Sequence, residues 1–494
     1  MQRARNLVHF YSQNYARYLA GRGPDGGAAT ARALWAHYKL GRYRTVVQRH
    51  LELAAPPDHW RSHVGLAISA AACNQPERMD RAIAQIQASD PSPRLRRTLA
   101  RGLAAFAPAA ALNVLAEQPP SVLQAALLEK TGQREEAIAC LDQSRAVEAE
   151  ASDDLNAILL QANLQATTAE AKLTALNHYL TRFQLEPVGV NQAGAMPCPQ
   201  TLCSQEPQRH CDGPLVSVIV ATYNGAARLQ ATLHSLFHQT YQSVEIIVID
   251  DCSTDDTSEV VRHLQRQHAC LRYRRLPANV GPYVAKSLGM ELASGTFVTC
   301  HDCDDWSHPR KITAQVQPLL QSRALVATAS RWVRLDESGH SYARSTYPLL
   351  RLNPSSILFR KADVMSHAGL WDCSRTGADS EFLARIKAVF GRQRVYTLAA
   401  PLAIGAHRSN SLMTAASTGM DTGPMHSDRL DYWQAWSDWH ISSLANHQEL
   451  LMPPVHSPRP FVAPEGLRNS NEAIATCLAW WQENSNVLDS ELGN

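Results

Sequence analysis

Two carboxylates one residue apart mark the most acidic point of the chain. Asp302 and Asp304 lie in the segment His301–Asp305, directly after the apolar run Thr296–Cys300. Side chains alternate along an extended strand, so these two carboxylates point the same way. Their like charges raise one pKa and cost stability unless a cation compensates them. Mn²⁺ or Mg²⁺ would do so and keep positions open for phosphate oxygens, although Asp-x-Asp also occurs often in solvated acidic loops.

Two further apolar runs also end in polar residues. Val216–Ala221 leads into Thr222-Tyr223-Asn224, and Val244–Ile249 leads into Asp250-Asp251. Short apolar runs that alternate with a helical pattern, here Ala226–His238, predict an α/β fold with a buried parallel sheet. In open sheets of this kind, ligands bind beyond the carboxyl ends of the strands. The three loops therefore predict one polar site, although Asp at such positions also commonly caps the next helix, here one beginning near Asp255.

Several motifs stand in the order in which one enzyme family has them. They are PLVSVIVATYNGAARLQATLHSLFHQTYQSVEIIVIDDCSTDDT (Pro214–Thr257), NVGPYVAKSLGMELASGTFVTCHDCDDW (Asn279–Trp306) and GLWDCSRTGADSEFLARI (Gly369–Ile386). On these stretches the chain resembles glycosyltransferase family 2, the inverting enzymes of the GT-A fold. The resemblance implies a domain that binds a nucleotide-sugar donor and transfers the sugar to an acceptor.

The resemblance also implies which residues bind the donor. Asp251 matches the position that binds the uracil of a UDP-sugar. Lys286 stands where the family usually has Arg near the diphosphate, and Lys lacks the bidentate fork of Arg. The donor-binding residues expected in this way are Ala221, Thr222, Tyr223, Asp251, Lys286 and Asp302.

The metal position follows from the same resemblance. Asp302 matches the acid near the ribose and the metal, and Asp304 matches the acid that ligates the metal. His407 lies where many relatives carry a His near the metal or the diphosphate, although a lone His is more often structural. The expected metal residues are thus Asp302, Asp304 and His407, with Mn²⁺ or Mg²⁺ as the cofactor.

The catalytic base is expected in the segment Gly377–Glu381. Asp379 falls on the family's catalytic-base position, and Glu381 matches a second acidic position and is the alternative base. The family's preceding Glu is Ala378 here, which leaves the acceptor contacts open. An Asp at the start of a helix is also a routine cap.

These residues together predict a single displacement. Asp379 would take the proton of an acceptor hydroxyl, whose oxygen attacks the donor's anomeric carbon and inverts its configuration. The expected acceptor is a hydroxyl of a glycan, glycolipid or protein, in surface polysaccharide biosynthesis. The alternative functions are a helical-repeat interaction protein with a degenerate transferase domain, and nucleotidyl transfer on a related fold.

Residues 28–187 are predicted to be helical throughout. Ala33–Leu53 and Ala126–Arg145 resemble each other, because each contains an apolar helix, a Gly-centred turn and a second amphipathic helix. This pattern is similar to the tetratricopeptide unit, whose period is about 34 residues. Further turns at roughly that spacing are expected near Asn74, Ala107 and Thr168. We expect a separate helical unit that either docks a protein partner or caps the enzyme.

The pattern divides the chain into five parts. They are an N-terminal segment (1–27), the helical domain (28–187), a linker (188–213), the GT-A domain (214–425) and a helical C-terminal extension (426–494). In the extension, Trp433, Trp436 and Trp439 recur every three residues, which predicts packing against the neighbouring domain. A platform for an acceptor sugar is the alternative.

Composition limits the remaining classes of function. The net charge of +2 argues neither for nor against a polyanionic partner, and no nucleic-acid partner is expected. No apolar run is long enough to span a membrane, so at most a peripheral membrane association is expected. The first residues lack a signal-peptide core, and the eleven cysteines are odd in number and irregularly spaced. The usual ligand spacing of a zinc site is absent from Cys198, Cys203, His210 and Cys211, so we interpret these residues as holding no metal. Cysteines that form no disulfide framework suit a reducing compartment, so a cytoplasmic protein is expected.

Overall fold

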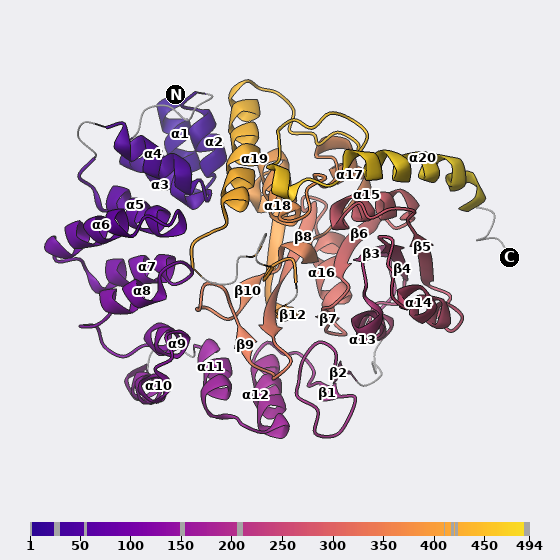
Figure 1. Ribbon diagram of the computed structural model, residues 1–494, viewed down its shortest axis with the longest axis horizontal. Coiled ribbons are helices and arrows are strands. Elements are labelled where there is room, and N and C mark those ends of the chain that lie inside the picture. The colour runs from indigo at the N-terminus through magenta and orange to yellow at the C-terminus, as the bar shows by residue number, and fades with distance from the viewer. Residues whose placement is uncertain are drawn as a thin grey trace.

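The protein folds as an all-α region, an α/β region and a short helical region, in chain order (Figure 1). The computed structural model describes residues 2–23, 30–53, 57–148, 154–204, 211–409, 411–415, 419 and 423–488. This order confirms the predicted fold class. His210, part of the zinc cluster considered above, lies outside the described residues, and the eleven cysteines are free thiols.

The N-terminal helices are α1 (Gln2–Tyr11), α2 (Tyr15–Ala20), α3 (Ala31–Lys39), α4 (Tyr43–Leu51), α5 (Trp60–Ala72), α6 (Pro76–Ala88), α7 (Pro93–Leu103), α8 (Pro108–Val114), α9 (Val122–Lys130), α10 (Arg134–Glu148), α11 (Asn156–Gln165) and α12 (Ala169–Thr181). The strands are β1 (Gly189–Val190), β2 (Leu202–Cys203), β3 (Val216–Thr222), β4 (Val244–Asp250), β5 (Leu271–Arg275), β6 (Phe297–Asp302), β7 (Trp306–Ser307), β8 (Ala327–Leu335), β9 (Ser341–Tyr342), β10 (Arg351–Leu352), β11 (Leu358–Arg360) and β12 (Val395–Ala406). The remaining helices are α13 (Ala226–Phe237), α14 (Thr257–Gln265), α15 (Pro282–Leu292), α16 (Lys311–Gln321), α17 (Lys361–His367), α18 (Ala378–Phe390), α19 (Ser427–Ala445) and α20 (Asn471–Leu488), with 3₁₀ turns η1 (Pro354–Ser356), η2 (Arg392–Arg394) and η3 (Glu465–Leu467).

The two mutually similar segments both form helical hairpins. Gly41 joins α3 to α4 with φ +74°, and Gly132 joins α9 to α10 with φ +84°. Glycine suits these turns because it adopts positive φ without steric cost. The further turns expected near Asn74, Ala107 and Thr168 also lie between helices. The helical nature of the region is confirmed, and its tetratricopeptide identity stays a prediction.

The central sheet is mixed. In the described part of the chain its main strand order is β5-β4-β3-β6-β11-β8-β12-β7, with β9 and β10 paired to β8. Strands β5, β4, β3 and β6 run parallel, whereas β11 is antiparallel to both of its neighbours. Alternate residues of β3 pack on opposite faces: Val218 and Val220 face α13, α14 and α16, and Ile219 faces α15. Both faces are covered, which explains the uninterrupted apolar runs.

The helical array α1–α12 curves along one side and the lower edge of the sheet in Figure 1. At that lower edge, Leu160 and Tyr179 from the helices share one buried cluster with Trp306, Val333 and Ile404 from the sheet. The expected linker lies between them and contains the two-stranded pair β1–β2. The helices and the sheet therefore have a common core, which differs from the expected separate unit. The domain boundaries themselves stay a prediction.

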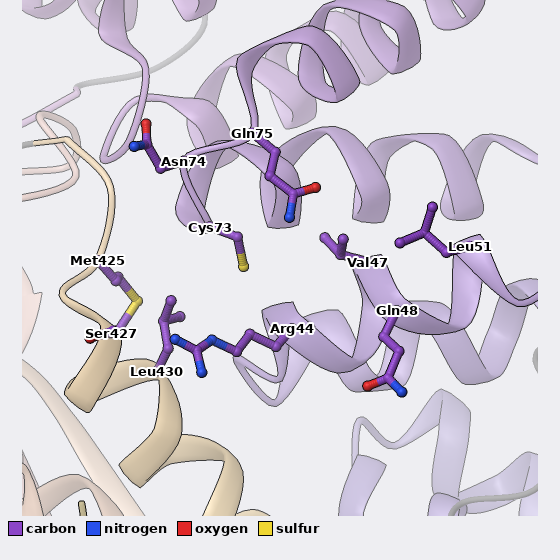
Figure 2. A pocket seen from close by; sticks show the side chains of 10 residues that line it. All are labelled: Arg44, Val47, Gln48, Leu51, Cys73, Asn74, Gln75, Met425, Ser427 and Leu430. Atoms are coloured by element: carbon purple, nitrogen blue, oxygen red, sulfur yellow. The ribbon is translucent and has the colours of Figure 1, made fainter. Parts of the chain in front are cut away.

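A second seam joins the helical array to α19. Trp433 donates from Nε1 to the Leu40 carbonyl at 2.6 Å, as its predicted packing against the neighbouring domain requires. Arg42 and Arg44 form ion pairs with Asp438 and Asp431. A cavity of about 450 Å³ lies beside these contacts. Figure 2 shows how side chains of α4 and of the α5–α6 turn face the start of α19 across it. Its lining is Arg44, Val47, Gln48, Leu51, Cys73, Asn74, Gln75, Met425, Ser427 and Leu430.

The shared core predicts that residues 211–494 do not fold stably without the helical array. Removing the array exposes Trp306, Val333 and Ile404, which are buried in the whole protein. Each such side chain contributes about 1.5–3 kcal/mol when buried, so the loss approaches the whole stability of an ordinary domain. Thermal unfolding followed by circular dichroism, with the full chain as reference, measures this. A cooperative transition of the fragment at the full chain's temperature would contradict it.

Among the described residues, no helix is long and apolar enough to cross a membrane.

Candidate active site

Three polar loops meet at the carboxyl ends of β3, β4 and β6. The parallel register places Ala221 of β3 beside Asp302 of β6, and Thr222 beside Asp250 of β4. The structure thus brings the first, second and third predicted loops to one edge of the sheet. Tyr223, next to Thr222, is half exposed. This edge is where the sheet architecture places a ligand.

Lys286 links the acidic loop to the start of α18. It is 2% exposed, and its Nζ lies 3.1 Å from Asp302 Oδ1 and 3.6 Å from Asp379 Oδ1. Burial acts to lower the pKa of Lys286, but the two carboxylates overcome it and raise that pKa well above its usual value. The same ammonium overcomes burial at Asp302 and lowers the pKa of that carboxyl. Lys286 is therefore a cation held between two predicted site residues.

Asp379 lies in the first turn of α18, and only one of its two carboxylate oxygens accepts hydrogen bonds within the described chain. Its Oδ2 accepts hydrogen bonds from Tyr283 Oη at 3.0 Å and Ser355 Oγ at 2.9 Å. Its Oδ1 accepts no hydrogen bond from the described residues. Burial raises the pKa of Asp379, and Lys286 opposes that rise. An oriented carboxylate with a raised pKa and one oxygen that accepts no hydrogen bond is suited to accept a proton.

Glu381 belongs to a different network. It is 0% exposed, its Oε1 and Oε2 accept from Arg385 Nε and Nη2 at 2.8 Å each, and His440 Nε2 lies 2.9 Å from Oε1. Burial acts to raise its pKa, but Arg385 lowers that pKa to about 2. Both oxygens are engaged in this network, which connects α18 to α19. The role of Glu381 as the alternative base stays a prediction.

The carboxylates expected to hold the metal are paired with side-chain cations. Arg408 contacts Asp304 Oδ2 through Nε at 2.8 Å and Nη2 at 2.7 Å, as Lys286 contacts Asp302. The His407 ring stacks on Tyr342, with the ring centroids 3.6 Å apart. In the described ranges, no group of three or more His, Cys, Asp or Glu residues is placed to hold a metal ion. The structure therefore does not gather Asp302, Asp304 and His407 into one metal site.

The two acids still suit a hard divalent cation chemically. Asp302 and Asp304 supply carboxylate oxygens, the ligand type that Mn²⁺ and Mg²⁺ take. The arginine contacts to Asp304 both use Oδ2. A cation that bound both residues would compete with Arg408 and Lys286 for them.

Asp251 is buried at the start of α15. Its Oδ1 accepts from the Val280 amide at 2.7 Å, and its Oδ2 accepts from the Gly281 amide at 2.8 Å. Burial raises the pKa of Asp251 to about 6, although these two amides oppose the rise. Asp251 does not cap α14, because its two oxygens accept from the Val280 and Gly281 amides, and the Thr257 amide of α14 donates to Asp255. Asp251 instead shapes the loop that precedes Lys286.

Three residues of the site escaped the sequence analysis. Tyr283 precedes Lys286 by three positions on α15, and helix spacing alone places those side chains on one face. Ser355 lies in η1, outside the stretches that resemble the family, and no sequence pattern around it indicates a functional residue. Arg408 follows His407 directly, but only the folded chain shows its contact with Asp304.

Comparison with known proteins matches the α/β region of the chain to glycosyltransferases. The sequence model of the family described as Glycosyl transferase family 2 matches residues 217–376. An uncharacterized glycosyltransferase of Haemophilus influenzae is 33% identical over 127 residues, which is 26% of this chain and 50% of that protein. A GalNAc(5)-diNAcBac-PP-undecaprenol beta-1,3-glucosyltransferase of Campylobacter jejuni is 43% identical over 94 residues, 19% of this chain and 30% of that protein.

An Escherichia coli protein named UDP-Glc:alpha-D-GlcNAc-diphosphoundecaprenol beta-1,3-glucosyltransferase is 28% identical over 123 residues, 25% of this chain and 48% of that protein. The chain thus spans half or less of the length of these relatives. The family match begins in β3 and includes Asp251, Lys286, Asp302 and Asp304, and it ends just before Asp379. Residues 217–376 thus match glycosyl transferase family 2, and the domain that contains them has the expected α/β architecture.

Proposed function

We propose that the protein is an inverting glycosyltransferase that moves a sugar from a UDP-sugar to a hydroxyl of a glycan or glycolipid. The observation that carries this proposal is the position of Lys286 between Asp302 and Asp379. It joins the loop expected to hold the donor diphosphate to the carboxylate expected to activate the acceptor. The names of the Escherichia coli and Campylobacter jejuni relatives support a glycolipid acceptor, and the former supports UDP.

Asp379 performs the proton transfer in this proposal. Tyr283 and Ser355 donate to its Oδ2, and Oδ1, which accepts no hydrogen bond from the described residues, is the oxygen that would take the proton. Oδ1 takes the hydroxyl proton while the acceptor oxygen forms a bond to the anomeric carbon. The bond from that carbon to the diphosphate oxygen breaks on the opposite face, so the configuration inverts and UDP leaves. Lys286 places a positive charge beside the departing diphosphate.

We propose Asp302 and Asp304 as the residues that would hold a divalent cation. Such an ion would supply charge neutralisation to the leaving diphosphate. Surface polysaccharide biosynthesis is the process that the relatives' acceptors favour.

Calorimetric titration with UDP tests the donor part of the proposal. We expect UDP to bind, to bind more tightly with Mn²⁺ than with EDTA, and to compete better than GDP or ADP. Asp304→Ala should remove the metal-dependent part of the affinity and leave the circular dichroism spectrum unchanged, because a strand-end loop contributes little core. Equal UDP affinity in Mn²⁺ and EDTA would contradict the metal assignment, and equal competition by GDP would contradict the base assignment.

The pH dependence of transfer tests the Lys286–Asp379 contact. Burial raises the pKa of Asp379 above its usual value, so kcat/KM should fall as the pH decreases through that raised pKa. Lys286 lowers the pKa of Asp379, so Lys286→Met should move this acidic limb to higher pH. Lys286→Arg keeps the charge and is the matched control, with little movement expected. If the acidic limb of Lys286→Met lay at the same pH as that of the wild type, Lys286 would have no influence on the pKa of the base.

A further inference from the structure

The first helix, α1, presents an apolar face to solvent. On its inner face Phe10 is buried, and its ring lies 5.1 Å from the ring of Tyr18 in α2. The opposite face carries Leu7, Val8 and Tyr11, which are 37%, 64% and 65% exposed. At 3.6 residues per turn, these three side chains lie within one arc of the helix. A globular protein normally turns such an apolar arc toward its core, whereas nothing in the described chain covers this one.

Exposed apolar side chains are concentrated in this part of the chain. Twelve large apolar side chains are exposed among the described residues, and five of them lie in the first 61 of the 494 residues: Leu7, Val8, Tyr11, Leu51 and Trp60. Single exposed apolar side chains are common on soluble proteins, but a group of them marks an interaction surface. Tyr and Trp are the residue types enriched where an apolar phase meets water. The distribution therefore indicates a binding surface around α1, at the upper end of the helical array (Figure 1).

Two arginines lie beside the apolar face of α1. Arg61 Cζ lies 5.9 Å from the Phe10 ring centroid and 4.5 Å from that of Trp60, so it links α1 to the start of α5. Arg392 of η2 donates from Nη1 to the carbonyl of Gln13, just beyond the end of α1, at 2.9 Å. Neither guanidinium forms an ion pair with a residue of the described ranges. The apolar face is therefore accompanied by cations from both the helical array and the α/β region.

Cations also outnumber acids in the sequence of this part of the chain. The first 61 residues contain ten lysines and arginines and three acids, whereas the remaining residues contain 37 and 42. Arg42 and Arg44 pair with acids of α19, and the other eight cations still exceed the three acids in number. The N-terminal part is thus positive in a protein whose net charge is only +2. An apolar surface with this charge complements an anionic lipid layer.

We propose that the surface around α1 binds the anionic face of a lipid bilayer. This α1 surface consists of Leu7, Val8, Tyr11, Trp60, Arg61 and Arg392. The apolar side chains enter the layer beneath the lipid head groups, and the arginines contact the lipid phosphates. A second copy of the chain fits less well, because a symmetric pair of these surfaces would set arginines against arginines. The proposal goes beyond the transferase function and rests on the surface alone.

Sedimentation of the full chain with vesicles tests the apolar part of the α1 surface. The vesicles contain phosphatidylcholine alone or an equimolar mixture with anionic phosphatidylglycerol. The wild type should bind the mixed vesicles more tightly and lose affinity as salt screens the arginines. Leu7→Gln/Val8→Gln should weaken this binding about tenfold or more, because two apolar side chains no longer enter the lipid. The matched control is Leu451→Gln/Val462→Gln, at side chains that are 38% and 72% exposed between α19 and α20, and it should bind like the wild type.

Arg61→Gln/Arg392→Gln tests the charge of the α1 surface separately. One arginine near an anionic membrane strengthens binding about fivefold, so the pair should weaken binding to mixed vesicles by roughly 25-fold. Binding to phosphatidylcholine alone should stay the same. Arg262→Gln/Arg266→Gln, at exposed positions of α14, is the matched control, with no loss expected. The thermal midpoints of all four variants should equal that of the wild type.

Three outcomes overturn the proposal. They are no binding of the wild type to mixed vesicles, binding by the two test variants that equals that of their controls, and a dimer in the absence of lipid that Leu7→Gln/Val8→Gln dissociates. Sedimentation velocity without vesicles measures the third outcome, which would assign the α1 surface to contact between two copies. Vesicle binding requires no donor, so failure of UDP to bind would contradict the transferase proposal and leave this one standing.

Discussion

Asp379→Asn is expected to lower kcat by roughly 10² to 10⁴ and to leave UDP affinity almost unchanged. Asparagine keeps the shape of the side chain and can still accept from Tyr283 and Ser355 through its carbonyl oxygen. It cannot take up a proton, so only the step that activates the acceptor is lost. Single-turnover transfer to the acceptor and calorimetry with UDP measure the two effects separately.

Variants of the two residues that donate to Asp379 give reference values for this loss of activity. Tyr283→Phe and Ser355→Ala each remove one hydrogen bond to Asp379 Oδ2 and leave the carboxylate in place. A hydrogen bond of ordinary strength contributes about 1 kcal/mol, so each variant should slow transfer by about fivefold. Near-normal transfer by Asp379→Asn would show that this carboxylate is not the base. A loss in Tyr283→Phe as large as that in Asp379→Asn would instead point to the phenol.

The central strands and their order of motifs were predictable from the sequence alone. The runs beginning at Val216 and Val244 became β3 and β4 with one added residue each, because parallel central strands are apolar on both faces. The third run became Phe297–Asp302, so Asp302 ends the strand and does not follow it. The meeting of the three polar loops at one edge of the sheet was predictable because these three strands run parallel.

Partners that are distant in sequence could not be predicted in the same way. His440 lies 59 residues from Glu381, and nothing local in either segment indicates the contact. Asp379 and Glu381 are both acids in the first turn of one helix, so their sequence context could not show that only Glu381 is ion-paired with Arg385. The core shared by α9–α12 and the sheet could not be predicted for a related reason. An apolar stripe shows that a face is buried but does not show which element covers it.

Glu381→Gln is expected to destabilise the protein by about 3–5 kcal/mol at neutral pH. The variant leaves the Arg385 guanidinium, which is 0% exposed, without its carboxylate, and a buried charge that loses its partner carries a cost of this size. Arg385 also donates to the Ala368 and Leu370 carbonyls, so it cannot move to water without breaking those bonds. Urea denaturation measures the change. Glu259→Gln, at an exposed position of α14, is the matched control, with a change within about 0.5 kcal/mol.

The difference in the free energy of unfolding between the wild type and Glu381→Gln should become smaller as the pH falls. The pKa of Glu381 is about 2 in the folded protein, below its usual value of 4.5. Its contribution to stability is therefore complete above that usual value and is lost as the pH falls toward 2. The unfolding midpoints of the two proteins should converge over this range, whereas the control should follow the wild type throughout. If Glu381→Gln were as stable as the wild type at neutral pH, Glu381 would have no structural role. Normal stability combined with a loss of transfer as large as that of Asp379→Asn would return Glu381 to the position of the base.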